Sequence, residues 1–311
     1  MLQIHTGEKI GPYQVDGFLG RGAFAQVYRA QDPSGRSVAL KVGDDSGGGR
    51  FLPRFGEVTL TRDPRAVSPD ECPAEALFLD PVDGARAEVL DAAEVDDLLL
   101  AEGRLLEQAD GHHVPRLHGI IDQKGRPVLA LDLVPGSTLR ERIRSMEGVR
   151  LDWLLDACTA VQELQQKGWH CHGDLKPENI FVGDDGRVTL IDPVPESCRE
   201  DRIVTTPWYN PFLRWDGKGD AQALGIMLYE LLVGALPFDR VPWSLAGTAP
   251  ESHDEEDRAL SMSMFLSYPP MRELNALAPR QLEHVFRAVT CDADYGLAEL
   301  QADLEDFLLR T

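Results

Sequence analysis

The structural pattern of this chain changes near residue 134, and this change constrains the fold more than any other feature of the sequence. Before that point, strand-like runs bounded by turn residues dominate, and one long helical segment interrupts them. After that point, apolar residues mostly recur at helical spacing. The pattern predicts an α+β protein with two lobes, a β-rich N-lobe that contains one helix and an α-rich C-lobe.

The N-lobe is expected at residues 11–134, after an N-terminal extension at residues 1–10. Its strands are expected at residues 15–19, 26–30, 37–42 and 128–133. The helix is expected to begin after Asp91 as its N-cap, because Glu94 follows three residues later in a variant of the capping box. Glu102 falls on the apolar stripe of this helix, so its carboxylate is expected to point inward and to have a cationic partner.

The C-lobe is expected at residues 135–311. Its helices are predicted at residues 139–146, 151–167, 221–232, 279–288 and 297–309. A short hairpin between two of them is predicted at residues 179–182 and 187–191. About residues 43–90 fit neither lobe simply and form either an added β-hairpin or a partly disordered loop. The candidate strands in this insert lie at residues 57–61 and 75–79.

The composition limits the partners that this chain can have. Its 311 residues include 52 acidic and 31 basic ones, for a formal net charge of −21. Such a charge repels phosphate backbones and anionic lipids, so neither nucleic acids nor membrane surfaces are expected as partners. The five cysteines are far apart, which indicates reduced thiols, and the first residues lack the apolar core of a secretory signal. We therefore expect a cytoplasmic protein.

Five short motifs follow one another along the chain. Gly20 and Gly22 form a glycine turn between two strands, Lys41 ends a strand and is one of only six lysines, and Glu102 follows on the helix. The last two motifs are His172-Gly173-Asp174-Leu175-Lys176-Pro177-Glu178-Asn179 and Ile191-Asp192-Pro193. A glycine turn alone is weak evidence, because ordinary hairpins contain it, but the ordered set is specific.

The ordered motifs resemble the signature set of eukaryotic-like Ser/Thr protein kinases, and the resemblance covers residues 11 to about 309. Residues 205–211 resemble the end of the activation segment of that family, and residues 220–238 resemble its central C-lobe helix. The resemblance implies a protein-kinase-like fold that transfers the γ-phosphate of ATP to a Ser or Thr hydroxyl of a protein substrate. The implied metal is Mg²⁺, with Mn²⁺ as an alternative.

The resemblance also implies which side chains handle the nucleotide. Lys41 is implied to hold the α- and β-phosphates and Glu102 to orient Lys41, whereas Asn179 and Asp192 are the implied metal ligands. Leu131 is the implied gatekeeper, and the backbone around Asp132 and Val134 is implied to hydrogen-bond with adenine. The implied ATP-binding residues are Leu19, Gly20, Gly22, Val27, Ala39, Lys41, Leu131, Asp132, Val134 and Phe181.

Further residues are implied on the side of the protein substrate. Asp174 is implied to accept or orient the proton of the attacking hydroxyl, and Lys176 to reach the γ-phosphate. Thr206 is expected to contact both residues. Glu178 and Glu230 match positions that contact basic residues in basophilic relatives, so a mild preference for basic residues N-terminal to the acceptor is expected.

Two departures from the family pattern bear on the control of activity. Gly173 stands where the family has an arginine that pairs with a phosphorylated activation loop, so such a switch is not expected. Pro193-Val194 replaces Phe-Gly after Asp192 and should restrict a flip of that residue. The 43–90 insert leads into the helix that carries Glu102, so a regulatory partner bound there is an alternative means of control. A tolerated surface loop without a role is an equally open interpretation of the insert.

Two other functions stay open. The same fold can serve as a pseudokinase, a nucleotide-binding scaffold without transfer. His172-Gly173-Asp174 and Ile191-Asp192-Pro193 also resemble small-molecule phosphotransferases of the aminoglycoside type, although Lys176 and Thr206 belong to a protein-substrate site. Outside these motifs, His112-His113 is interpreted as a solvated helix end, because no cysteine or carboxylate falls at metal-ligand spacing.

Overall fold

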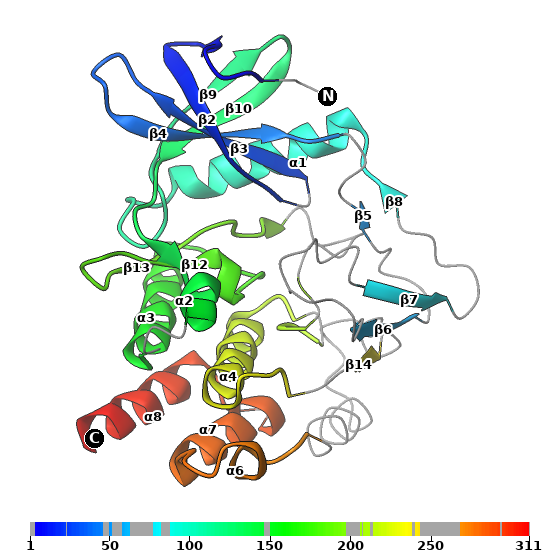
Figure 1. The fold of residues 1–311 in the computed structure, drawn as a ribbon, viewed down its shortest axis with the longest axis vertical. Coiled ribbons are helices and arrows are strands. Elements are labelled where there is room, and N and C mark those ends of the chain that lie inside the picture. Colours follow the sequence, from blue (N-terminus) through cyan, green and yellow to red (C-terminus); the bar gives the residue numbers. More distant parts are fainter. Residues whose placement is uncertain are drawn as a thin grey trace.

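The computed structural model describes residues 4–22, 24–45, 50–51, 58–62, 77–81, 88–145, 150–196, 206, 208–211, 214–237, 240–242, 268–292 and 294–310. They form two lobes, with a sheet and helix α1 in one lobe and most of the helices in the other (Figure 1). The predicted α+β class and the contrast between a β-rich and an α-rich lobe are confirmed.

Six antiparallel strands form the N-lobe sheet, in the order β1-β2-β3-β4-β10-β9. Their bounds are Lys9–Ile10 (β1), Tyr13–Arg21 (β2), Ala25–Gln31 (β3), Ser37–Gly43 (β4), Leu117–Gln123 (β9) and Arg126–Asp132 (β10). The four predicted strands are confirmed as β2, β3, β4 and β10. The prediction missed β9, because this edge strand is only partly buried and lacks a clear apolar alternation.

Helix α1, Ala92–Glu107, packs against this sheet through contacts with β4, β9 and β10. Its predicted capping box is confirmed, since the Asp91 carboxylate accepts a hydrogen bond from Glu94 N and the Glu94 carboxylate accepts one from Asp91 N. A cap of this kind stabilises a helix by about 1 kcal/mol. The buried side chains of α1 are Val95, Leu99, Glu102 and Leu106.

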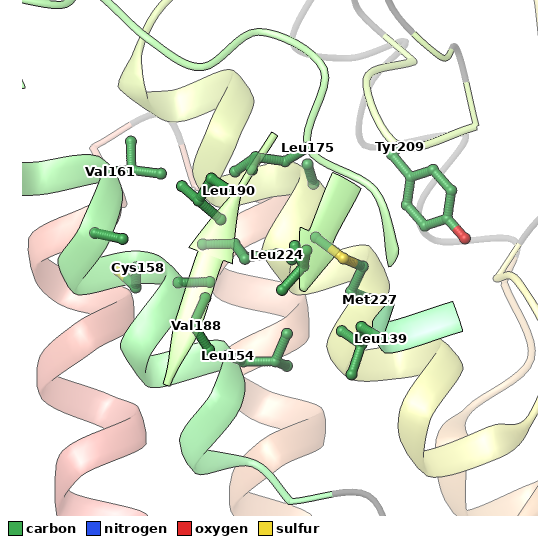
Figure 2. Packing of buried hydrophobic residues seen from close by; sticks show 14 of the residues in the cluster. Leu139, Leu154, Cys158, Val161, Leu175, Val188, Leu190, Tyr209, Leu224 and Met227 are labelled. Carbon is green, nitrogen blue, oxygen red and sulfur yellow. The ribbon is translucent and has the colours of Figure 1, made fainter. Parts of the chain in front are cut away.

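The C-lobe is built around α4, Gly217–Val233, which contacts α3, α6, α7 and α8. The other helices are α2 (Leu139–Ser145), α3 (Asp152–Gln166), α6 (Met271–Leu274), α7 (Arg280–Cys291) and α8 (Leu297–Arg310). Figure 2 shows Leu224 and Met227 of α4 among side chains of α2, α3 and β13. The five predicted helices are confirmed as α2, α3, α4, α7 and α8. Within the described ranges, no helix has the length and apolar character needed to cross a bilayer.

A three-stranded sheet carries the predicted hairpin. Its strands are β11 (Ser137–Thr138), β12 (Ile180–Val182) and β13 (Val188–Leu190), in that order. The hairpin is confirmed as β12 and β13, and a 3-10 turn at Pro177–Asn179 leads into β12. The motif that begins at His172 therefore ends where this sheet begins.

The 43–90 insert contains four short strands among its described residues. They are β5 (Arg50–Phe51), β6 (Val58–Arg62), β7 (Leu77–Pro81) and β8 (Glu88–Val89). β5 pairs with β8, and β6 pairs with β7, so the two predicted strands are confirmed as β6 and β7. Most other residues of the insert lie outside the described ranges. A further strand after α4, β14 (Arg240–Pro242), pairs with β6 and joins the insert to a segment of the C-lobe.

Candidate active site

Lys41 is the meeting point of three elements. It lies on β4, is 4% exposed, and donates hydrogen bonds to both carboxylate oxygens of Glu102 on α1, at 2.8 and 2.7 Å. The same ammonium donates to Oδ1 of Asp192, after β13, at 2.7 Å. Glu102 therefore has the cationic partner that its place on the apolar stripe predicts. The contacts join a strand and a helix of the N-lobe to a segment of the C-lobe.

The charges of this cluster depend on burial and on one another. Burial disfavours the charged ammonium, but the Asp192 and Glu102 carboxylates raise the pKa of Lys41 well above its usual value. Burial also opposes ionisation of Asp192, yet the Lys41 ammonium holds the pKa of Asp192 below its usual value. Burial raises the pKa of Glu102 to about 6 in spite of its ion pair. At pH 7, all three side chains are therefore mainly charged.

The backbone of Asn179 is hydrogen-bonded to that of Ile191, the residue before Asp192. Ile191 N donates to the Asn179 carbonyl at 2.9 Å, and Asp192 has a φ of +55°, a left-handed conformation that aspartate tolerates better than most residues. The Asp192 side chain is 45% exposed. The Asn179 amide nitrogen is engaged by Asp174, which leaves the amide oxygen as its ligand atom. A carboxylate and an amide oxygen suit Mg²⁺, so these residues fit the implied metal.

Asp174 is held between two neighbours that orient its carboxylate. Lys176 Nζ donates to Asp174 Oδ2 at 2.7 Å, and Thr206 N donates to Asp174 Oδ1 at 2.7 Å. Lys176 Nζ also donates to Thr206 Oγ1 at 2.9 Å, so Thr206 contacts both residues as expected. Asn179 Nδ2 donates to Asp174 at its carbonyl and its carboxylate, at 2.8 and 3.1 Å. This network fixes the direction in which Asp174 points.

Asp220 anchors the loop that carries Asp174. It is 2% exposed in the first turn of α4, and its two carboxylate oxygens accept hydrogen bonds from the backbone N of His172 and of Gly173, at 2.7 and 3.0 Å. His172 Nε2 lies 3.0 Å from the Ile191 carbonyl, and burial lowers the pKa of His172 to about 4, so the ring is neutral. The sequence placed Asp220 at the start of the predicted central helix but did not reveal this anchoring contact. A carboxylate at the start of an otherwise apolar helix was the available signal.

A family model described as the protein kinase domain matches residues 87–245, just over half of the chain. The chain belongs to the protein kinase domain family. This kinase domain is 28% identical over 251 residues to CBL-interacting protein kinase 4 of Oryza sativa subsp. japonica, over 74% of this chain and 46% of the relative. It is 26% identical over 248 residues to Aurora kinase A-B of Xenopus laevis, over 74% of this chain and 55% of the relative. The chain thus spans about half the length of these relatives.

Solved structures support the same fold. The kinase domain resembles the structure described as the PpkA-294 apo form with a TM-score of 0.66 at 19% identity, over 97% of this chain and 99% of that one. It resembles the PknI kinase domain of Mycobacterium tuberculosis with a TM-score of 0.59 at 17% identity, over 98% and 99% of the two chains. At such identities the likeness concerns the fold alone.

Gly173 lies in a place that leaves little room for a side chain. Its φ is +84°, and a Cβ added to it would lie 3.2 Å from a ring carbon of Trp215 and 3.3 Å from Val194 Cβ. Trp215 and Val194 form a buried apolar cluster with Cys171. Apolar groups thus surround the position where the kinase family has an arginine, so this position offers no cation to a phosphorylated activation loop.

The implied ATP-binding residues lie on strands of both lobes and on the links after them. Leu19 and Gly20 lie on β2, Val27 on β3, Ala39 on β4, Leu131 and Asp132 on β10, Phe181 on β12, Gly22 after β2 and Val134 after β10. Leu131 is directly opposite Ala39 in the β4–β10 register. The Asp132 N–H donates to the Arg116 carbonyl at 2.9 Å, so of the two backbone polar groups of Asp132 the carbonyl is the one left for the expected hydrogen bond with adenine.

Glu178 and Glu230 come together as expected, but both are paired with an arginine of this chain. Arg140 on α2 is 5% exposed and donates to Glu178 Oε1 at 2.7 Å and to Glu230 Oε1 at 2.6 Å. Tyr209 OH donates to the other Glu230 oxygen at 2.6 Å. Arg140 was not among the residues predicted from the sequence. Its pairing with Glu178 and Glu230 limits how strongly these carboxylates can attract basic residues of a substrate, so the preference stays a mild one.

Proposed function

We propose that this kinase domain transfers the γ-phosphate of ATP to Ser or Thr hydroxyls of protein substrates. The proposal rests on one observation, the assembly of two charged networks that meet at the boundary of the lobes. Their members are Lys41, Glu102 and Asp192 in one network and Asp174, Lys176, Asn179 and Thr206 in the other. A sequence relative from Arabidopsis thaliana is named as a serine/threonine-protein kinase, which supports the same class of acceptor.

The first network suits the phosphates of ATP. Lys41, oriented by Glu102, would bind the α- and β-phosphates, which need a cation held in a fixed direction. Asp192 and Asn179 would hold Mg²⁺, and the bound metal would neutralise charge on the phosphates. The net negative charge of this chain repels anions such as ATP. The positive charge that binds the phosphates therefore has to come from residues inside the site.

The second network suits the attacking hydroxyl. Asp174 would orient the Ser or Thr hydroxyl and take its proton as the hydroxyl oxygen bonds to the γ-phosphorus and the bond from that phosphorus to ADP breaks. Although burial opposes it, the Asp174 carboxylate raises the pKa of Lys176, so Lys176 stays cationic beside the transferred group. Thr206 would hold the side chains of Asp174 and Lys176 in position beside the substrate hydroxyl.

A cytoplasmic location is part of this proposal. Among the described residues, Cys158, Cys171 and Cys291 are thiols outside any disulfide, which agrees with a reducing compartment. The acidic net charge supports protein substrates over nucleic acids and membrane surfaces.

The test is transfer of label from γ-labelled ATP with Mg²⁺ to the chain itself and to a generic basic protein. Asp174→Asn should lower the transfer rate by about 10²- to 10⁴-fold, with nucleotide binding nearly unchanged, because Asp174 acts on the hydroxyl. Asp184→Asn, at an exposed turn between β12 and β13, is the matched control and should keep the wild-type rate. Nucleotide binding without transfer would indicate a pseudokinase, and transfer only to small molecules would indicate an aminoglycoside-type enzyme.

A further inference from the structure

Two adjacent histidines and a distant glutamate form a compact cluster away from the active-site networks. His112 and His113 lie in the loop between α1 and β9, and Glu163 lies on α3 in the C-lobe. His113 Nε2 is 2.9 Å from His112 Nδ1 and 2.8 Å from Glu163 Oε2. The three atoms all lie within 4.8 Å of one another. The fold thus supplies the carboxylate that sequence spacing near the histidine pair did not reveal.

Hydrogen bonds alone cannot give each of the three ligand atoms in this cluster a well-aligned partner. An imidazole nitrogen carries either one proton or one lone pair, in the plane of its ring. If His113 Nε2 carries a proton, that proton can point fully at only one of its two neighbours. If it carries a lone pair, it faces the lone pairs of the Glu163 carboxylate. A cation that accepts a lone pair from each of the three side chains satisfies all of them at once.

The cluster is held in place by the backbone around it. The His113 carbonyl accepts a hydrogen bond from Leu190 N at 2.7 Å, and the His112 carbonyl accepts one from the Arg187 guanidinium. His112 N donates to Asp110 Oδ1 at 3.0 Å. Preorganised imidazoles lose little freedom when they bind a metal.

We propose that His112, His113 and Glu163 form a zinc site that joins the loop after α1 to α3. Two imidazoles and one carboxylate are a known zinc ligand set, whereas Mg²⁺ and Ca²⁺ prefer oxygen ligands. Ligand atoms around tetrahedral zinc lie about 3.3 Å apart, given Zn–N bonds of about 2.0 Å. The two separations that involve His113, 2.8 and 2.9 Å, need a small opening to reach this value, and the third pair of ligand atoms lies within 4.8 Å.

Two of the three proposed ligands are accessible from solvent. The Glu163 side chain is 43% exposed, and Glu163 also lines an open polar pocket together with Gln162 and Gln166 of the same helix. The other two ligands differ in access, because the His113 side chain is 13% exposed and His112 lies at the surface. Zinc can therefore enter and leave without unfolding of the lobe.

The test is a zinc titration of the metal-free full chain by calorimetry, with excess Mg²⁺ present to saturate oxygen sites. The expected result is one zinc per chain, with affinity lowered at least tenfold in His113→Ala and in Glu163→Gln. His284→Asn removes an exposed histidine from α7 and should bind zinc as the wild type does. Zinc should also raise the melting temperature of the wild type more than that of Glu163→Gln, because it binds only the folded site.

Glu163→Gln keeps the size of an exposed helical side chain, so it tests the site even if His113→Ala fails to fold. Cobalt(II) provides a second probe, because a tetrahedral site with nitrogen ligands gives it a visible absorption band that zinc then removes. The proposal is overturned if the wild type binds no zinc in a saturable way. It is equally overturned if Glu163→Gln binds zinc with the affinity of the wild type.

Discussion

The Lys41 ammonium lies 2.7 Å from Oδ1 of Asp192, although 151 positions separate the two residues along the chain. This ion pair joins β4 of the N-lobe to the segment after β13 of the C-lobe. It also leaves Lys41 bonded to both oxygens of Glu102. The structure therefore holds the two lobes in the arrangement that aligns Lys41, Glu102 and Asp192. Because this alignment depends on the charges of the three side chains, the activity should depend on pH.

Activity should fall on the acidic side of pH 6. Burial raises the pKa of Glu102 to about 6, so Glu102 becomes protonated below that pH and no longer fixes Lys41. The value of kcat/KM should then fall about tenfold per pH unit. Glu102→Gln should lower the rate and remove this acidic limb, whereas Glu107→Gln, at an exposed position of α1, should keep it. An unchanged limb in Glu102→Gln would show that another group titrates.

Removal of Arg140 should create a preference for basic substrates. In Arg140→Ala, Glu178 and Glu230 would lack their cation, and an arginine N-terminal to the acceptor could replace it. Peptides with and without such an arginine should differ in kcat/KM by at least tenfold, compared with a mild preference in the wild type. The free energy of unfolding should fall by about 3 kcal/mol, because a buried charge loses its partner.

The control for Arg140→Ala is Arg104→Ala, at an exposed position of α1. It should change neither the peptide preference nor the stability by a measurable amount. A peptide array on which Arg140→Ala keeps the wild-type preference would contradict the prediction, and a wild-type preference for acidic flanks would contradict the expected mild preference for basic ones.

The kinase domain should be active without a phosphorylated activation segment. Gly173, Trp215 and Val194 offer no cation to a phosphate, and Asp192 already faces Lys41. Phosphatase-treated enzyme and Thr205→Val, at a position outside the described residues, should keep the wild-type rate within about threefold. Steady-state transfer of label is the measurement. Loss of activity on dephosphorylation would refute constitutive activity.

Gly173→Ala should destabilise the fold more than an equivalent change elsewhere. Its positive φ costs about 1–2 kcal/mol for a residue with a Cβ, and the added Cβ meets Trp215 at 3.2 Å. Gly186→Ala is a matched control, because its φ is +82° and nothing lies within 4 Å of the added Cβ. Chemical denaturation should show a larger loss for Gly173→Ala. Equal losses would mean that Trp215 simply moves aside.

The 43–90 insert should affect the rate through α1. β8 ends two positions before the Asp91 cap, and β6 pairs with β14 of the C-lobe chain, so the insert connects the start of α1 to the other lobe. Replacement of residues 46–88 by a short Gly-Ser linker should lower the rate, since a displacement of Glu102 by about 1 Å can cost about 10²-fold. A rate within twofold of the wild type would identify the insert as a tolerated surface loop and would argue against a regulatory partner there.

Local features of this protein followed from its sequence. The capping box at Asp91 and Glu94, the main N-lobe strands and the C-lobe helices depend on hydrophobic periodicity and on contacts between near neighbours in the chain. The order of the motifs around Lys41, Asp174 and Asp192 also predicted the fold class, because these side chains are useful together only in one arrangement of two lobes. Such information is present in short segments, so no knowledge of the tertiary structure was needed.

Other relationships were decided by the tertiary structure alone. Arg140 and Glu230 are separated by 90 positions, and His113 and Glu163 by 50, so no spacing rule of a helix or strand links them. Each pair meets because packed elements bring two distant segments together, and a surface charge and a buried ion pair look alike in a sequence. The partner that the fold brings to a carboxylate decides whether that carboxylate is neutralised by an arginine, as in Glu230, or faces imidazoles, as in Glu163. The reason is that the energy of a charge depends on what lies within a few ångströms of it.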